Sequence, residues 1–176
     1  MTQYPHERSA KQNQGSMNTT WPLMSVNGTD TSDVQAYMSN RGLSWKLAEA
    51  NGWYPSRDAM DNFLRIVIPA VTSVKGHVYW QARAVSPNVH VRYQTPRGSR
   101  HGALICVLVD PFEVSGVPYT EPVVIVEGPM DALAVAECGY DAIALMGIKP
   151  GNEALEHLVT LVKKRPTLIV LDNEPL

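Results

Sequence analysis

The last third of the chain alternates apolar β-branched runs with helical patterns, and this order constrains the fold more than any other feature. Strands are indicated at 123–128, 142–147 and 167–173, and helices at 129–139 and 152–164. Continuously apolar strands that are joined through helices by short connections are typical of a parallel sheet with helices on both faces. We therefore expect an α/β unit whose ligands gather at the carboxyl ends of the strands.

Carboxylates stand where these predicted strands end. Glu127 follows the first strand, and Asp172 and Glu174 close the third. Two residues apart on an extended segment, Asp172 and Glu174 point to the same side and can chelate one cation, for which magnesium is the first candidate. Asp131 lies one turn into the following helix, near the same edge of the sheet. Taken singly, Glu127 or Asp131 is better explained by the favourable dipole of a helix N-terminus, but the carboxylates taken together favour a metal site.

Two glycines, Gly128 and Gly147, follow the first two strands of this unit. Glycine allows the backbone to turn sharply or a phosphate to approach closely. Neither GxGxxG nor GxxxxGK[ST] occurs in the sequence, so a dinucleotide-binding fingerprint and a P-loop are both excluded.

The segment before the α/β unit has a different organisation. Polar residues without hydrophobic periodicity occupy the first thirty positions and predict a flexible leader. Two short helical patterns follow, with Thr31 or Ser32 as the expected N-cap of the first and Ser44 as that of the second. Several apolar strands come next, and Pro69 is expected to break the one at 63–71. This order predicts a small mixed α+β lobe. We expect a leader at 1–30, this lobe at 31–120 and the α/β unit at 121–176.

Charge is strongly segregated along the chain. Residues 62–109 carry six basic and no acidic side chains, whereas residues 110–176 carry four basic and eleven acidic ones. An acid-free basic stretch indicates an anionic partner such as phosphate, and the acidic third indicates a metal or proton-transfer site. A solvated charged surface that binds nothing explains the split equally well. In the strand predicted at 77–85, Arg83 falls on the polar face with His77, Tyr79 and Gln81.

Several classes of protein are excluded by composition. No run of about 18 apolar residues occurs among the 176, and the N-terminus has no secretory signal, so we expect a cytoplasmic protein without a membrane partner. The two cysteines, Cys106 and Cys138, lie in apolar runs and are predicted to be buried thiols. The absence of CxxC excludes a zinc ribbon.

The carboxylate-bearing segments resemble a known family. EGPMDALA after the first strand, ALMG after the second and LIVLDNE at the third are similar to the toprim domain, a Rossmann-like α/β module of primases, topoisomerases and nucleases. The resemblance implies a phosphoryl-transfer site that uses Mg²⁺ or Mn²⁺. It implies that Glu127 is the acid/base residue and that Asp172 and Glu174 bind the metal, with Asp131 beside them.

Upstream segments make the resemblance more specific. YMSNRGLS, RIVIPA, YWQARAV and VRYQTP resemble the catalytic core of bacterial-type DNA primases in a minimal or truncated form, and the similarity runs from about Tyr37 to Asp172. It implies an enzyme that makes short RNA primers from ribonucleoside triphosphates on single-stranded DNA, with a replicative helicase or single-strand-binding protein as partner. Arg83 and Arg92 are expected to face template and nucleotide, and Arg97 and Arg100 to extend that basic surface.

Two other functions stay open from the sequence. The metal-binding pair reads DNE where the family has DxD, and the sequence ends soon after it, which favours a catalytically incomplete primase-derived accessory or inhibitor that binds nucleic acid. A toprim nuclease ranks third, because small toprim ribonucleases carry the domain at the N-terminus whereas about 120 residues precede it here.

Overall fold

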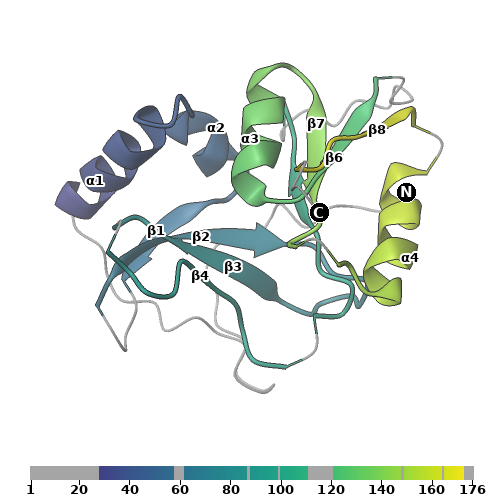
Figure 1. Ribbon diagram of the computed structural model, residues 1–176, viewed down its shortest axis with the longest axis horizontal. Coiled ribbons are helices and arrows are strands. Elements are labelled where there is room, and N and C mark those ends of the chain that lie inside the picture. Colours follow the sequence, from purple (N-terminus) through teal and green to yellow (C-terminus); the bar gives the residue numbers. More distant parts are fainter. Residues whose placement is uncertain are drawn as a thin grey trace.

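The structure is a computed structural model with two sheets, to which the helices are packed (Figure 1). It describes residues 28–57, 62–86, 88–98, 100–110, 121–147, 149–163 and 165–172. The predicted leader lies almost entirely outside the described residues, as does Glu174.

Five strands and two helices make up the part of the chain before residue 110. They are α1 (Gly28–Ser39), α2 (Trp45–Ala50), β1 (Tyr54–Arg57), β2 (Leu64–Ala70), β3 (Tyr79–Ala84), β4 (Tyr93–Gln94) and β5 (Ile105–Val107). The part after residue 120 contains β6 (Val123–Val126), α3 (Pro129–Glu137), β7 (Asp141–Ala144), α4 (Asn152–Val162) and β8 (Thr167–Ile169).

The first two helices follow their sequence signals only in part. The Ser44 hydroxyl accepts a hydrogen bond from the Leu47 amide and caps α2, as the sequence predicts. Helix α1 begins at Gly28, so the predicted caps Thr31 and Ser32 lie inside it, and the Ser32 hydroxyl bonds to the Gly28 carbonyl instead. The prediction of that N-terminus was wrong because a hydroxyl inside a helix can bond back to the carbonyl four residues earlier.

Strands β1 to β4 form an antiparallel sheet in that order. We had predicted that Pro69 would break the strand at 63–71. It lies within β2 instead, opposite Trp80. Strands β1 and β4 are also absent from the sequence-based prediction, since they are short and only partly buried. Both faces of β3 are buried, so Arg83 is not on an exposed polar face.

The second sheet has the order β5-β7-β6-β8, in which β6 is parallel to both β7 and β8, and β5 is antiparallel to β7. Side chains of β6 alternate between two apolar clusters: Val124 packs with α3, and Ile125 packs with Leu158 of α4. The two helices therefore cover opposite faces (Figure 1). The predicted fold class, a mixed lobe followed by a Rossmann-like parallel unit, is confirmed.

The two sheets are joined where β2 ends and β5 begins. Val71 and Leu104 exchange backbone hydrogen bonds of 2.8 and 2.9 Å and form an isolated antiparallel bridge. Asn51, after α2, adds a second link, because its carboxamide both donates to and accepts from the backbone of Leu108. The orientation of the basic lobe on the α/β unit is therefore set by backbone pairing as well as by packing.

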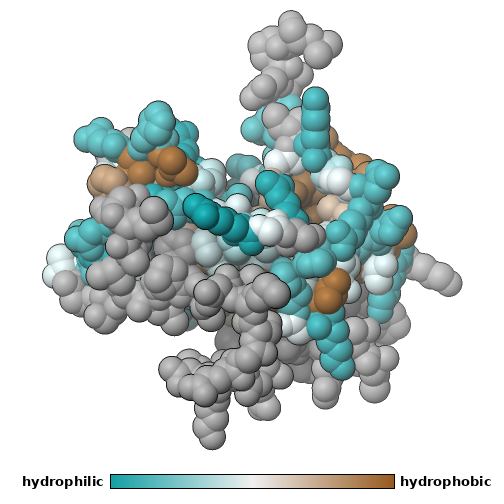
Figure 2. All heavy atoms as spheres, turned by 90° about the horizontal axis from the view of Figure 1, so that it is seen from below, coloured by the Kyte–Doolittle hydropathy of each residue, from teal (hydrophilic) through white to brown (hydrophobic). Residues whose placement is uncertain are grey.

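Apolar side chains remain exposed at the far edge of the second sheet. The longest stretch covers β8 and the residues after it, with Leu168, Ile169, Val170 and Leu171. Helix α4 contributes Leu155 and Val159. Seen from below, the described surface is largely hydrophilic, with separate hydrophobic patches that include one on the side of α4 and β8 (Figure 2). None of the described helices has the length and hydropathy needed to cross a membrane.

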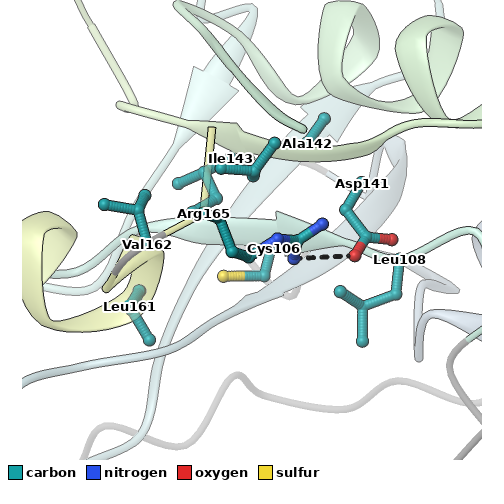
Figure 3. A pocket seen from close by; sticks show the side chains of 9 residues that line it. Cys106, Leu108, Asp141, Ala142, Ile143, Leu161, Val162 and Arg165 are labelled. Carbon is teal, nitrogen blue, oxygen red and sulfur yellow. Dashed lines mark hydrogen bonds and ion pairs between the residues drawn. The ribbon is translucent and has the colours of Figure 1, made fainter. Parts of the chain in front are cut away.

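A small cavity of about 30 Å³ lies at the amino-terminal end of the parallel strands (Figure 3). Beside it, Arg165 Nη1 lies 3.0 Å from Asp141 Oδ2 and ties the α4–β8 connection to the start of β7. Cys106 also lines the cavity, and its thiol has a pKa raised to about 12, first by desolvation and then by the Asp141 carboxylate. The cavity can hold water but no nucleotide, and it lies at the opposite end from the candidate site.

Cys106 and Cys138 should differ sharply in reactivity. Only the thiolate reacts, so the raised pKa of Cys106 makes it inert near neutral pH, whereas Cys138 follows α3 and is exposed rather than buried as we had predicted. We expect a thiol-reactive disulfide reagent to titrate one thiol in the native protein and two after denaturation. Cys138→Ser should leave no fast-reacting thiol, and a fast phase surviving in that variant would contradict the assignment.

Gly102 is expected to be essential for the contact between the lobes. Its φ is +62°, and a Cβ at this position would lie 2.8 Å from the Glu153 carbonyl oxygen in α4. Gly102→Ala should cost about 1 kcal/mol or more in unfolding free energy beyond the loss in Gly76→Ala, measured by chemical denaturation. Gly76 is the matched control, since its φ is +81° and no atom lies within 4 Å of its Cβ position. Equal losses in the two variants would refute this role.

Candidate functional site

The carboxyl ends of the parallel strands bring two of the predicted carboxylates together. Glu127 follows β6 directly, and its Oε1 accepts a 3.0 Å hydrogen bond from the backbone amide of Asp172, just beyond β8. This bond continues the parallel β6–β8 pairing, in which the Val170 amide bonds to the Ile125 carbonyl. Glu127 is partly buried and Asp172 is exposed, so the pair faces solvent at the sheet edge.

Asp131 lies at the same edge because α3 begins immediately after β6. A Cβ on Gly128 would lie 2.8 Å from Asp131 Oδ2, so this carboxylate rests against the glycine. Gly128 is the N-cap of α3 and has no side chain with which to cap it, and Pro129 occupies the first turn. The absence of a side chain at Gly128 thus gives the Asp131 carboxylate its place, close to Glu127 in sequence and at the positive end of the helix.

Gly147 lies on the neighbouring loop, after β7. It has a φ of +134°, and the preceding Met146 has a φ of +61°, which is uncommon for a residue with a Cβ. The Leu145 amide bonds to the Val126 carbonyl, so this loop leaves the sheet beside the end of β6. Gly128 and Gly147 therefore lie on adjacent strand ends, where backbone can approach a ligand closely.

Arg83 is one of two buried arginines in the basic lobe, the other being Arg65 of β2. Arg83 lies in β3 with 7% of its surface exposed, and no described carboxylate forms an ion pair with it. A buried charge normally has a partner, because removing a cation from water costs free energy. An anionic ligand would supply the missing negative charge.

Two tyrosines hold the Arg83 side chain. Its Nε donates a 3.0 Å hydrogen bond to the Tyr37 hydroxyl of α1, and its guanidinium lies 4.6 Å from the ring centre of Tyr93 in β4. Arg41 in turn lies over the Tyr37 ring, at 4.9 Å. Alternating cations and aromatic rings stabilise one another and fix the plane of the guanidinium.

Tyr93 connects the arginine to the carboxylate edge. Desolvation raises the pKa of its hydroxyl, Arg83 acts in the opposite direction, and the Asp131 carboxylate is close enough to raise the pKa further. The buried cation of the first lobe and an acid of the second therefore both act electrostatically on the same phenol. The structure brings the basic and acidic regions of the sequence together at this junction.

The other predicted site residues are less closely connected. Arg92 precedes Tyr93 and is exposed, and its carbonyl accepts from the Ala84 amide. Arg97 and Arg100 are exposed in the segment after β4. Glu174 lies outside the described residues.

The carboxylates at this edge have the donor chemistry that magnesium prefers. No three His, Cys, Asp or Glu side chains in the described ranges are arranged to hold an ion together. Magnesium, however, keeps several waters and usually takes only one or two protein carboxylates. Asp172 and Asp131 supply such oxygens, and the Glu127 oxygen not bonded to the Asp172 amide is a third.

The aromatic contacts of Arg83 were not predicted from the sequence. Tyr37 and Tyr93 are far apart in the sequence, and only the packing of α1 and β4 against β3 brings them together. The alternating pattern of β3 does place Gln81 on the same face as Arg83. It does not show that this face is buried.

The charge of Arg83 leads to a direct test with a simple anion. Pyrophosphate at roughly ten times its Kd should raise the Tm of the wild type by about 3 to 6 °C, since binding to the folded state adds about 1.4 kcal/mol. Arg83→Met should abolish this shift, and Lys75→Met, which removes an exposed cation of the same lobe, should retain it. Differential scanning fluorimetry measures both, and equal shifts in the two variants would show that the anion binds elsewhere.

Comparisons with solved structures identify the fold. A scan against protein-family models finds no match, and a search of curated proteins finds none either. Among solved structures, the primase fragment of the bacteriophage T7 primase-helicase protein matches with a TM-score of 0.58 and 15% identity, covering 94% of this chain and 64% of that one.

Two further solved structures show the same similarity. The Escherichia coli primase catalytic core has a TM-score of 0.55 and 15% identity, over 81% of this chain and 55% of that one. The primase domains of bacteriophage T7, in a complex with lagging-strand DNA polymerase and an RNA/DNA hybrid, have a TM-score of 0.50 and 16% identity, over 77% and 65%. The chain spans less than two thirds of each of these proteins, and it has the fold of the bacterial and bacteriophage primase catalytic cores.

Proposed function

We propose that this chain is a primase-type nucleotidyltransferase that joins ribonucleotides into short RNA primers on single-stranded DNA. The observation that carries the proposal is the junction of the two lobes. There, a buried arginine without a carboxylate partner packs against Tyr93, and Asp131, at the carboxyl edge of a toprim-like sheet, is close enough to act on the same phenol.

The reaction requires the two kinds of charge that meet at this junction. The 3′-hydroxyl oxygen of the growing strand attacks the α-phosphorus of the incoming triphosphate, and pyrophosphate leaves with the electrons of the broken bond. Glu127 accepts the hydroxyl proton, which a carboxylate at the solvent-facing edge of the sheet can pass on to water. Arg83 binds phosphate oxygens through the outer nitrogens of its guanidinium, because Tyr37 already occupies Nε.

The surrounding residues extend this anion site. Gly128 and Gly147 allow backbone amides to approach a phosphate, and Arg92 lies beside Tyr93 where a nucleic acid backbone could continue. Arg97 and Arg100 add positive charge further along the same segment. Binding through such contacts is expected to weaken steeply with salt.

A divalent cation completes the proposed site, with Mg²⁺ or Mn²⁺ as the candidates. Asp172, Glu174 and Asp131 would hold it. When bound, the ion would neutralise phosphate charge and lower the barrier for attack at phosphorus.

The partners follow from the same proposal. The T7 primase domains that share this fold are found with an RNA/DNA hybrid, and the T7 primase fragment comes from a primase-helicase protein. We propose single-stranded DNA and ribonucleoside triphosphates as ligands here, and a replicative helicase or single-strand-binding protein as partner.

A second candidate is a nucleic-acid-binding module without catalysis. It is favoured by the pair Asp172 and Glu174, which reads DNE where toprim proteins have DxD. Such a protein would bind single-stranded DNA in a salt-dependent manner without metal-dependent synthesis.

Glu127→Gln separates catalysis from folding. The amide retains an oxygen that can accept from the Asp172 backbone, so stability should change by less than about 1 kcal/mol, but it cannot take up a proton. Incorporation of labelled ribonucleotides on single-stranded DNA should fall by about 100-fold or more relative to the wild type. Reactions with Mg²⁺, with Mn²⁺ and with EDTA show whether that synthesis depends on metal.

Glu121→Gln is the matched control, since Glu121 is exposed just before β6, at the opposite end of the same strand. It should retain full synthesis. Undiminished synthesis by Glu127→Gln would remove this residue from the mechanism. Salt-sensitive DNA binding by a wild type that synthesises nothing would favour the binding module.

A further inference from the structure

Gln81 in β3 carries a buried polar atom without a partner. The residue is 9% exposed, and its Oε1 accepts no hydrogen bond from any residue in the part of the chain that the structure describes. A buried carbonyl that lacks a donor costs free energy, and most such groups in proteins are satisfied. Because Oε1 itself has almost no exposed surface, a donor from outside the chain can reach it when the carboxamide turns outward.

Gln81 lies on the same face of the sheet as Arg83. In β3 these two residues share their side with Tyr79, which belongs to the core cluster between the sheets, whereas Trp80 and Ala82 pack in a separate cluster on the other face. Residues two apart on a strand are about 6.6 Å apart along it, so one small ligand can contact both side chains.

Strand β4, which neighbours β3, is too short to pair with Gln81. Strand β4 pairs through Tyr93 with Arg83 and through Gln94 with Ala82, and it ends there. On the other side, Ile68 of β2 lies opposite Gln81 and offers no polar side chain. The carboxamide is thus flanked by an apolar residue on one side and by the end of a strand on the other.

The two groups are chemically complementary to different parts of one nucleotide. Arg83 supplies a cation for a phosphate, and the Gln81 carbonyl needs an N–H or O–H donor. Nucleosides carry such donors next to the phosphate, as ribose hydroxyls and as amino groups of the bases. A simple phosphate anion without a nucleoside would satisfy Arg83 alone.

We propose that Gln81 is a specificity-determining residue that accepts a hydrogen bond from the sugar hydroxyl or the base amino group of a nucleotide whose phosphate binds Arg83. The inference rests on the proposed function and adds to it a second contact that distinguishes nucleotides from inorganic phosphates. It also explains why β3 carries two polar side chains on a face that is otherwise packed as core.

Gln81→Met tests the inference through binding and stability together. Methionine fills a similar volume without a polar atom, so the ligand-free variant should have a Tm equal to or higher than that of the wild type. Its affinity for ATP, measured by isothermal titration calorimetry, should fall about tenfold, while its affinity for pyrophosphate stays unchanged. A residue with a purely structural role would instead lower the Tm and spare the affinity for ATP.

Ligand analogues identify the donor. If the ribose hydroxyl is the donor, dATP should bind the wild type more weakly than ATP does, and Gln81→Met should bind the two alike. If the base amino group is the donor, purine riboside triphosphate, which lacks this group, should bind the wild type more weakly than ATP does. Gln81→Met should then bind these two ligands alike. Equal binding of all three ligands by the wild type overturns the inference.

Control variants separate this inference from the proposed function. Gln94→Met makes the same change on β4, on the opposite face, and should keep the affinity for ATP. Loss of ATP binding in Arg83→Met but not in Gln81→Met overturns only the role of Gln81. Absence of ATP binding by the wild type counts against the nucleotide site as a whole. Gln81→Leu serves as a second variant, and failure of both to fold would show that Gln81 is structural and overturn the inference.

Discussion

The apolar core that α3 shares with both sheets is the constraint on which the rest of the structure depends. Leu133 and Ala136 of this helix belong to the same apolar cluster as Ile66 and Ile68 of the first sheet and Val124 of the second. Because one core serves both lobes, the helix cannot shift without disturbing both sheets. The residues at the N-terminus of α3, where Asp131 lies, are therefore held at a fixed distance from the arginine of β3. The backbone bridge between Val71 and Leu104 fixes the same arrangement from the other end.

Local periodicity was sufficient to predict the α/β unit. Continuous apolar runs around β6 and β7, and helical spacing between them, specify a parallel sheet with little dependence on the remainder of the chain. The meeting of Glu127 and Asp172 was accessible for the same reason, since parallel strands end at one edge and both residues follow such strands. For Glu127 and Asp172, the order of strands and helices in the sequence was therefore enough to predict that they lie at one edge of the sheet.

The other half of the site depends on contacts that no local pattern contains. Arg83 was expected on a polar surface, but α1 and β4 bury it, and its partners Tyr37 and Tyr93 come from segments on either side of β3 in the sequence. Strand β4 has only two residues, and Pro69 is tolerated within β2, so neither feature follows from propensity. The observed charge segregation was useful because it identified the interacting lobes. It could not identify which arginines would be buried.

The energetic cost of Arg83 is the clearest link between this structure and nucleotide chemistry. An arginine that served only to stabilise the fold could lie beside a carboxylate, and Asp131 is near enough to influence the pKa of Tyr93. Instead, the phenol ring of Tyr93 stands beside the guanidinium, and the acids gather at the neighbouring sheet edge around Glu127. Keeping the two charges apart sacrifices stability in the ligand-free protein, because each is left without its counter-ion. Under the proposed function, the same separation would leave both able to act on one phosphate, with the arginine binding its oxygens and the carboxylates holding the cation or proton that its chemistry requires.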